Sequence, residues 1–269
     1  MHVVSFASGK GGVGKTTLVA NLGTLWARRL QKRVLCVDAD WVLGKLPIIL
    51  GVTPPQSLSV VLEKDIPIRN IVHQVKEEYP LFLVASPNGH QTWQELTALQ
   101  RRVLFYELGS LVNDFDIVLL DHSSGAGPAV LEFASAAHTH VLATTIEPTS
   151  LTDAYAIIKM LAQTYRVQHF SLVLTQVHDC EQADAVCERF LNWVYDQLAV
   201  SVRVVGMIPF DMDFSRAIQL RQPYISLYPH TQAAKKIEEI GEVLLEKRLQ
   251  HHGLRFAPVA EHPYRGKNS

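Results

Sequence analysis

Cysteine is scarce in this chain, and the 3 cysteines among its 269 residues form neither a CxxC pair nor a disulfide framework. We therefore expect Cys36, Cys180 and Cys187 to be reduced thiols. For Cys180 and Cys187, a small, partly buried apolar residue is a better interpretation than a metal ligand. The spacing of Cys180 and Cys187 places both on one predicted helix.

An excess of charge is also absent, because 25 lysines and arginines face 26 aspartates and glutamates, a formal net charge of -1 at pH 7. A nonspecific nucleic-acid binder would show a basic excess, so we expect no specific nucleic acid as a partner, although a local basic patch stays open. No apolar run approaches the roughly 18 to 20 residues that span a bilayer. Residues 1–7 carry none of the features of a secretory signal, and we expect a cytoplasmic protein.

Short apolar runs rich in β-branched residues recur along the chain. Most are nearly continuous rather than alternating, which is typical of parallel strands covered by helices on both faces. The runs are residues 2–7, 33–38, 81–86, 116–121, 140–145, 171–176 and 203–208. They predict a doubly wound, mostly parallel α/β sheet of seven to eight strands flanked by helices, with a ligand crevice at the carboxyl ends of the strands.

Helical spacing of apolar residues fills several of the segments between these runs. The predicted helices are residues 15–31, 92–112, 149–165 and 231–250. Their apolar stripes are Leu18, Leu22, Leu25, Trp26 and Leu30; Leu96, Leu99, Val103 and Leu111; Tyr155, Ile158 and Leu161; and Ile237, Ile240, Leu244 and Leu245. Length alone permits two small domains, but the strand-helix repeat favours one domain over residues 1–250, followed by a polar tail at residues 251–269.

A glycine-rich segment, GKGGVGKT at residues 9–16, satisfies the phosphate-loop pattern GxxxxGK[ST] between an apolar strand and an amphipathic helix. Backbone N–H groups of such a loop surround phosphate oxygens, and the following helix adds its positive end. Lys15 is placed to reach the β- and γ-phosphates of ATP, and Thr16 to offer a hydroxyl to Mg²⁺. The residues expected to bind the nucleotide here are Gly11, Gly12, Val13, Gly14, Lys15, Thr16 and Thr17.

Carboxylates end two of the predicted strands. Asp38 and Asp40 lie in VDAD, and Asp121 ends IVLLD in the manner of a Walker B residue. A strand-end aspartate is often only a turn residue, but the phosphate loop favours a role beside Mg²⁺.

The loop contains a second lysine, and KGGVGKTT resembles the deviant Walker A loop of the MinD/ParA group of ATPases. The resemblance implies that Lys10 crosses the interface of an ATP-bound homodimer and reaches the nucleotide of the other copy. Binding a cation in trans would make dimerisation depend on ATP. The alternative is a solvated surface lysine.

The stretch EPTSLTDAYAIIKML at residues 147–161 resembles a segment of the FlhG family, MinD-like ATPases also called FleN or YlxH, which control flagellar number and placement. The likeness extends over roughly residues 2–245. It continues through DADWVLGKLPIILG, QELTALQRR, FDIVLLDHSSGAG, IPFD and AIQLRQPYISLYPHTQAAKKI.

This resemblance implies roles for further residues. Asp40 would position the attacking water, while Asp38 and Asp121 would organise the metal together with Thr16. Lys10, Lys15 and Asp40 are thus the predicted catalytic residues. Pro209, Phe210 and Asp211 would lie beside the adenine, and Thr175 stands where the family has a base-contacting asparagine.

Departures from the family pattern occur in the segment after Asp40. Where FlhG proteins usually read DADLGLAN, this chain reads DADWVLGK, so that Val42 replaces a glycine and Lys45 an asparagine. A β-branched residue stiffens the loop, which leaves slow or negligible hydrolysis open. The glycine loop also begins so early that we expect no preceding extension of the kind that stimulates the GTPase FlhF.

Two classes of function remain open. The first is an ATPase switch that dimerises with ATP and acts on a flagellar basal-body component, an FlhF-like GTPase or a transcription activator, or positions a division site or a cargo as MinD and ParA do. The second is a nucleotide-binding scaffold that scarcely hydrolyses ATP.

A short basic amphipathic segment containing Leu245, Leu249, Leu254 and Phe256 suggests a reversible association with the inner face of the cell membrane, and ordinary packing is the alternative.

Overall fold

A computed structural model describes residues 1–64, 66–87 and 92–246, which build one eight-stranded sheet in the order β3-β4-β2-β5-β1-β6-β7-β8. The strands are β1 His2–Ser8, β2 Val34–Ala39, β3 His73–Gln74, β4 Leu81–Val84, β5 Ile117–Ser124, β6 Thr139–Thr144, β7 His169–Val177 and β8 Ser201–Pro209. All seven predicted strands are present and pair in parallel. The additional strand β3 pairs antiparallel with β4 at the sheet edge, and its two residues are too few to give a sequence signal.

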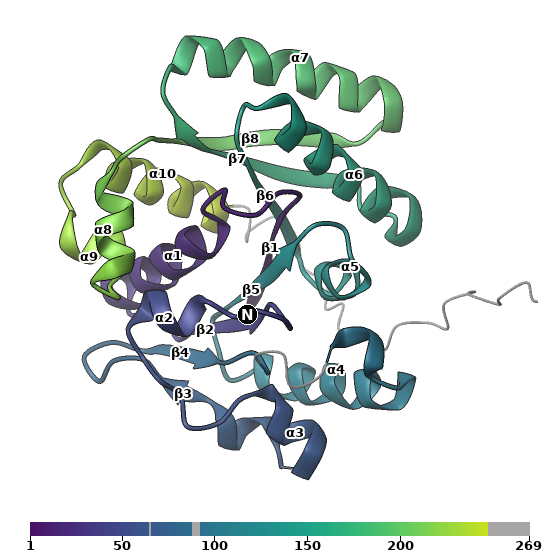
Figure 1. The fold of residues 1–269 in the computed structure, drawn as a ribbon, viewed down its shortest axis with the longest axis vertical. Coiled ribbons are helices and arrows are strands. Elements are labelled where there is room, and N and C mark those ends of the chain that lie inside the picture. Colours follow the sequence, from purple (N-terminus) through teal and green to yellow (C-terminus); the bar gives the residue numbers. More distant parts are fainter. Residues whose placement is uncertain (65, 88–91, 247–269) are drawn as a thin grey trace, which may run out of the picture.

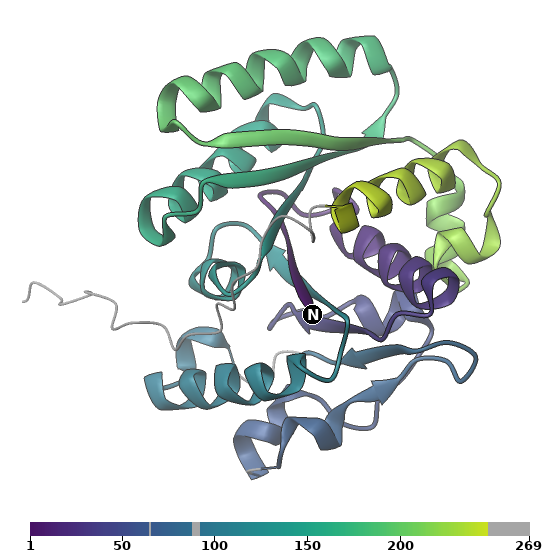
Figure 2. The ribbon, with the colours of Figure 1, turned by 180° about the vertical axis from the view of Figure 1, so that it is seen from behind.

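Helices cover both faces of the sheet, which is why its central strands are apolar throughout (Figures 1 and 2). Helices α1 and α10 lie on one side, and α4, α5 and α6 lie on the other. The α-helices are α1 Lys15–Leu30, α2 Leu46–Leu50, α3 Leu58–Lys64, α4 Ala98–Val112, α5 Pro128–Ser135, α6 Pro148–Tyr165, α7 Cys180–Leu198, α8 Asp213–Gln219, α9 Tyr224–Leu227 and α10 Gln232–Glu246. Two 3-10 turns, η1 Ile68–Ile71 and η2 Trp93–Glu95, complete the described elements.

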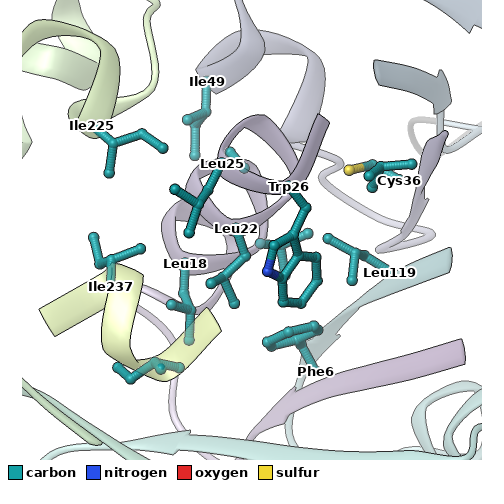
Figure 3. Packing of buried hydrophobic residues seen from close by; sticks show 14 of the residues in the cluster. Phe6, Leu18, Leu22, Leu25, Trp26, Cys36, Ile49, Leu119, Ile225 and Ile237 are labelled. Carbon is teal, nitrogen blue, oxygen red and sulfur yellow. The ribbon is translucent and has the colours of Figure 1, made fainter. Parts of the chain in front are cut away.

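Helix α1 anchors the glycine loop because its apolar stripe packs into the centre of the molecule. Figure 3 shows Leu22 and Trp26 of α1 close to Phe6 of β1 and Leu119 of β5. The predicted stripe is confirmed except at Leu30, which lies in the last turn of the helix and is exposed. Burial of such side chains contributes about 1.5 to 3 kcal/mol each, so the helix start is firmly placed beneath the ligand crevice.

The prediction of a helix over residues 92–112 was wrong about where the helix begins. The side chain of Thr92 and then that of Thr97 each form a capping box, so a 3-10 turn ends before α4 begins at Ala98. This break changes which face is buried: Leu99 and Val103 are exposed, whereas Leu104 and Leu108 pack against the sheet. The last four residues of the helix predicted over 231–250 and the tail at 251–269 lie outside the described residues, as do Leu249, Leu254 and Phe256.

Candidate functional site

The predicted site residues converge because β1, β2 and β5 are parallel neighbours whose carboxyl ends meet at one edge of the sheet. The glycine loop joins β1 to α1 at this edge (Figure 1). Asp38 of β2 and Asp121 of β5 are direct partners in the strand register, so their carboxyls lie side by side. Both are buried, with 0% and 1% of their surface exposed.

Backbone donors line the glycine loop. Gly12 and Gly14 adopt left-handed conformations with φ of 81° and 84°, and no other atom lies within 4 Å of the place where a Cβ would stand on either residue. The N–H groups from Gly11 to Thr17 have no acceptor among the residues that the structure describes. Backbone N–H groups without an acceptor at the start of a 16-residue helix form an anion-binding site. These donors fit the oxygens of a polyphosphate.

A buried ion pair closes the floor of the loop. The Lys15 ammonium lies 2.5 Å from Asp121 Oδ1 and 3.5 Å from the Thr16 hydroxyl. Burial raises the pKa of Asp121, and the charge of Lys15 opposes this rise. Burial and then the charge of Asp121 raise the pKa of Asp38, whereas the N–H groups of Asp40 and Leu46, which donate to it, act in the opposite direction. Two buried carboxyls thus share one cation, and a further cation would favour their ionised forms.

The donor set fits Mg²⁺ bound together with phosphates. Within residues 1–64, 66–87 and 92–246, no group of three or more His, Cys, Asp or Glu side chains could hold a metal ion by itself. Mg²⁺ is usually held by one or two carboxylates, substrate phosphates and water, rather than by a cage of protein ligands. Thr16, Asp121 and Asp38 provide this kind of partial site at the loop.

Asp40 begins a tight turn at the mouth of the site. Its Oδ1 accepts the N–H groups of Val42 and Leu43, each at 3.2 Å, which fixes the carboxylate relative to the backbone. Trp41 points the other way into the core, where its ring meets Trp93 edge to face with centroids 5.1 Å apart. Val42 in turn is exposed, so the β-branched side chain lies on the surface of the loop.

A cavity of about 620 Å³ joins the loop to the ends of β7 and β8, and this volume is within the usual range for small-molecule sites. Its wall contains the predicted residues Gly11, Gly12, Val13, Gly14, Lys15, Thr16, Thr17, Asp40, Thr175, Pro209, Phe210 and Asp211. Residues not predicted also line it, among them Ser8, Ser124, Gln176 and Phe214. Ser8 directly precedes the glycine loop, and Ser124 directly precedes Gly125. Their positions next to these glycines were the sequence signal that could have identified them as site residues.

Two polar side chains of β7 that line this cavity already form hydrogen bonds within the protein. The Thr175 hydroxyl donates to the carbonyl of Val13 at 2.7 Å and also lies 3.2 Å from the carbonyl of Thr144. Gln176 likewise donates from its amide to the carbonyl of Gly12 at 2.9 Å. These bonds hold the glycine loop against β7, so Thr175 and Gln176 position the loop.

The carboxylate of Asp211 is likewise already engaged in hydrogen bonds within the protein. One of its carboxylate oxygens accepts the Tyr224 hydroxyl at 2.5 Å, and the other accepts the N–H of Asp213 at 2.8 Å. Phe210 is half exposed, and its ring stacks on His178 with centroids 4.5 Å apart. The face of an aromatic ring, rather than a free carboxylate, is therefore what this end of the cavity offers to a planar base.

Lys10 does not face the cavity in the single chain. Its ammonium pairs with Glu147 at the start of α6 at 2.5 Å, and both side chains are about half exposed. Gly9 packs directly on Asp153 of α6, where a Cβ would collide with the aspartate. Helix α6 therefore fixes the first half of the loop, a contact between distant segments that no local pattern in the sequence indicates.

Known proteins resemble this chain over most of its length. The sequence model of the ParA family, described as NUBPL iron-transfer P-loop NTPase, matches residues 1–245. Antiactivator FleN of Pseudomonas aeruginosa is 28% identical over 242 residues, covering 90% of this chain and 85% of that protein. Flagellum site-determining protein YlxH of Helicobacter pylori is 24% identical over 245 residues, covering 91% and 82%.

The fold is also found among solved structures. Septum site-determining protein MinD of Pyrococcus horikoshii, complexed with Mg-ADP, superposes with a TM-score of 0.74 at 21% identity, covering 92% of this chain and 97% of that one. No helix in the described part of the chain is long and apolar enough to cross a membrane.

Proposed function

Because the chain belongs to the ParA family of P-loop NTPases and resembles its FlhG members, we propose that it is an ATP-hydrolysing switch that pairs with a second copy while ATP is bound. The observation that carries this proposal is the row of open N–H donors from Gly11 to Thr17 above the buried ammonium of Lys15. Such an array stabilises concentrated negative charge, and a triphosphate supplies it.

In this proposal the residues of the glycine loop bind the phosphates, and the residues around the loop orient the metal ion and the attacking water. The donors from Gly11 to Thr17 hold the phosphates, and Lys15 shifts part of its interaction from Asp121 to the β- and γ-phosphates. Thr16, Asp121 and Asp38 would hold Mg²⁺, which when bound neutralises phosphate charge. Asp40, fixed by its own turn, accepts a hydrogen bond from the attacking water and orients it toward the terminal phosphate.

Lys10 links the chemistry to assembly. Its ammonium is half exposed and held by one surface carboxylate, so it can exchange Glu147 for the phosphates of a facing copy. A nucleotide contacted from both sides stabilises the dimer, and hydrolysis then resets the monomer.

A single-turnover measurement of ATP hydrolysis tests the catalytic part of the proposal. Asp40→Ala is expected to lower the rate constant by at least tenfold while the variant still binds ATP. Asp184→Ala, at an exposed position of α7, is the matched control and should behave as the native chain does. Indistinguishable rates for Asp40→Ala and the native chain would remove the catalytic role of Asp40.

A nucleotide-binding scaffold with negligible hydrolysis is the second candidate, and the departures from the FlhG pattern at Val42 and Lys45, in the segment after Asp40, favour it. The same experiment separates the two functions. A native chain that binds ATP but converts none in a single turnover would support the scaffold.

The biological role that we propose is the control of number or placement of flagella, as the names of the FleN and YlxH relatives suggest. Candidate partners are a transcription activator, an FlhF-like GTPase or a basal-body component, while division-site and cargo positioning are alternatives that the MinD and ParA likeness supports. Pull-down from cells with ATP-locked and nucleotide-free forms would assign the process. Recovery of the same proteins with both forms would contradict a nucleotide-controlled switch.

Iron transfer, which the description of the family model names, has less support from the cysteines. Cys36 is buried beneath α1, and Cys187 is buried on α7, whereas Cys180 is exposed. Burial raises the pKa of Cys187 to about 11 and that of Cys36 further, so neither is a ready thiolate ligand.

Peripheral membrane binding is a separate proposal about residues 246–269, most of which lie outside the described residues. A basic amphipathic segment would bind an anionic surface reversibly. Co-sedimentation with anionic vesicles and ATP should fall when these residues are removed. Unchanged sedimentation would end this proposal.

A further inference from the structure

The backbone of Lys45 is fixed from both sides. Gly44 packs so closely on Ser86 and Asp38 that a Cβ at this position would collide with the Ser86 side chain and stand 2.7 Å from Asp38 Oδ2. Leu46 is fully buried, and its N–H donates to the same Asp38 carboxylate at 3.1 Å. Lys45 lies between these two anchored residues, so only its side chain is free to move.

Lys45 is one of the residues that line the nucleotide cavity, together with Asp40 and Lys15. It is exposed, and its ammonium has no carboxylate partner among the residues that the structure describes. The two lysines of the loop differ in this respect, because Lys15 is paired with Asp121 and Lys10 with Glu147. Lys45 therefore brings an uncommitted positive charge to the cavity.

Its position in the chain indicates which phosphate this charge meets. Lys45 follows Asp40 by five residues, in the segment that the Asp38 carboxylate ties to the end of β2. Gly44 and Leu46 both contact Asp38 Oδ2, so the backbone of Lys45 lies beside the carboxylate assigned to Mg²⁺, at the end of the cavity assigned to the terminal phosphate. A lysine is a compact cation with a flexible stem, suited to following a phosphate group as a point charge.

We propose that Lys45 binds the terminal phosphate of ATP in cis, so that a single copy distinguishes ATP from ADP before a second copy supplies Lys10. This inference rests on the proposed function, because it assigns a further residue to the same nucleotide. It gives the switch an order of events: ATP is recognised within the monomer, and dimerisation follows.

Nucleotide affinity, rather than turnover, tests the inference. Calorimetric titrations with Mg²⁺ would compare ADP with a non-cleavable ATP analogue, in a Lys10→Ala background that removes the contribution in trans. Lys45→Asn should weaken binding of the analogue by about tenfold and change ADP affinity by less than about twofold, since only the analogue presents the additional charged group. Lys45→Arg should keep most of the discrimination.

The control is Lys76→Asn, which removes one positive charge at an exposed position outside the cavity wall. It should change neither affinity. Equal weakening of both ligands by Lys45→Asn, or no weakening, would overturn the role of Lys45. If instead the native chain bound neither nucleotide, the proposed function itself would fail, so the two failures are distinguishable.

Discussion

The ammonium of Lys10 lies 2.5 Å from the carboxylate of Glu147, and the pair joins the glycine loop to the start of α6 within one copy. Both side chains are about half exposed, and such pairs contribute about 0 to 1 kcal/mol. The second lysine of the loop is thus held locally and weakly. A group that carries more negative charge, such as a polyphosphate presented by a second copy, would compete well for it.

Removing the local partner should therefore favour assembly. We expect Glu147→Gln to strengthen dimerisation with a non-cleavable ATP analogue by up to about fivefold, because Lys10 no longer has to leave a carboxylate. Analytical ultracentrifugation would measure the dimer dissociation constant, with Glu181→Gln on α7 as the control. Weaker dimerisation of Glu147→Gln would mean that Glu147 acts within the dimer instead.

The buried pair of Lys15 and Asp121 should behave differently from the surface pair. Lys15→Met leaves two carboxyls buried without their cation, so the free energy of unfolding without nucleotide should fall by about 3 kcal/mol. Adding Asp121→Asn should recover part of this loss, because one of the two buried carboxyls is then replaced by an uncharged amide. Urea denaturation of the two single variants and the double variant measures the coupling, and strictly additive losses would contradict it.

Gly44 should tolerate no side chain. Gly44→Ala would drive a Cβ into Ser86, so we expect a loss of about 1 to 3 kcal/mol in stability and displacement of the turn that carries Asp40. Gly127→Ala is the matched control, since no atom lies within 4 Å of its Cβ position and its φ is -68°. Ser86→Gly should recover part of the stability that Gly44→Ala loses in thermal denaturation, since the close contact with Asp38 Oδ2 remains, and no recovery would show that Ser86 is not the source of the strain.

His122 should make stability depend on pH. The side chain is fully buried, and burial, with a smaller contribution from the charge of Lys15, lowers its pKa from 6.5 to about 3. Between these values the unfolded chain binds a proton that the folded chain does not, so His122 lowers stability as the pH falls from 6.5 toward 3.

Replacing this histidine gives the measurement. Relative to His122→Asn, the native chain should lose up to about 1.4 kcal/mol per pH unit below pH 6.5 in urea denaturation. The exposed His230→Asn serves as the control. A difference between the native chain and His122→Asn that stays constant from pH 7 to pH 4 would show that His122 is not held neutral.

The fold was predictable from sequence because two strong local signals agreed. Continuous apolar runs identified the parallel strands, and the spacing from Gly9 to Thr16 identified the loop between a strand and a helix. Leu99 and Val103 were assigned to the wrong face because apolar periodicity was carried across Thr97, where a new capping box resets the helix. The spacing of apolar residues predicts which side chains are buried only within one uninterrupted helix.

The site was predictable only in part. Its members could be named because they lie at or near the carboxyl ends of strands or match the family pattern, but their hydrogen-bond and ion-pair partners could not. Glu147 is 137 residues from Lys10 along the chain, and the Thr175 hydroxyl is 162 residues from the Val13 carbonyl that it binds. Such contacts depend on the packing of α6 and β7 beside the loop, which no local pattern encodes.

The central claim is that a bound triphosphate joins two copies of this chain through Lys10. Sedimentation of the purified chain with Mg²⁺ and a non-cleavable ATP analogue tests it most directly, beside samples with ADP and the Lys10→Ala variant. The account predicts a doubling of mass for the native chain with the analogue alone, and a monomer in the other two samples. A native chain that binds the analogue and stays monomeric, or a Lys10→Ala variant that dimerises equally well, would contradict it.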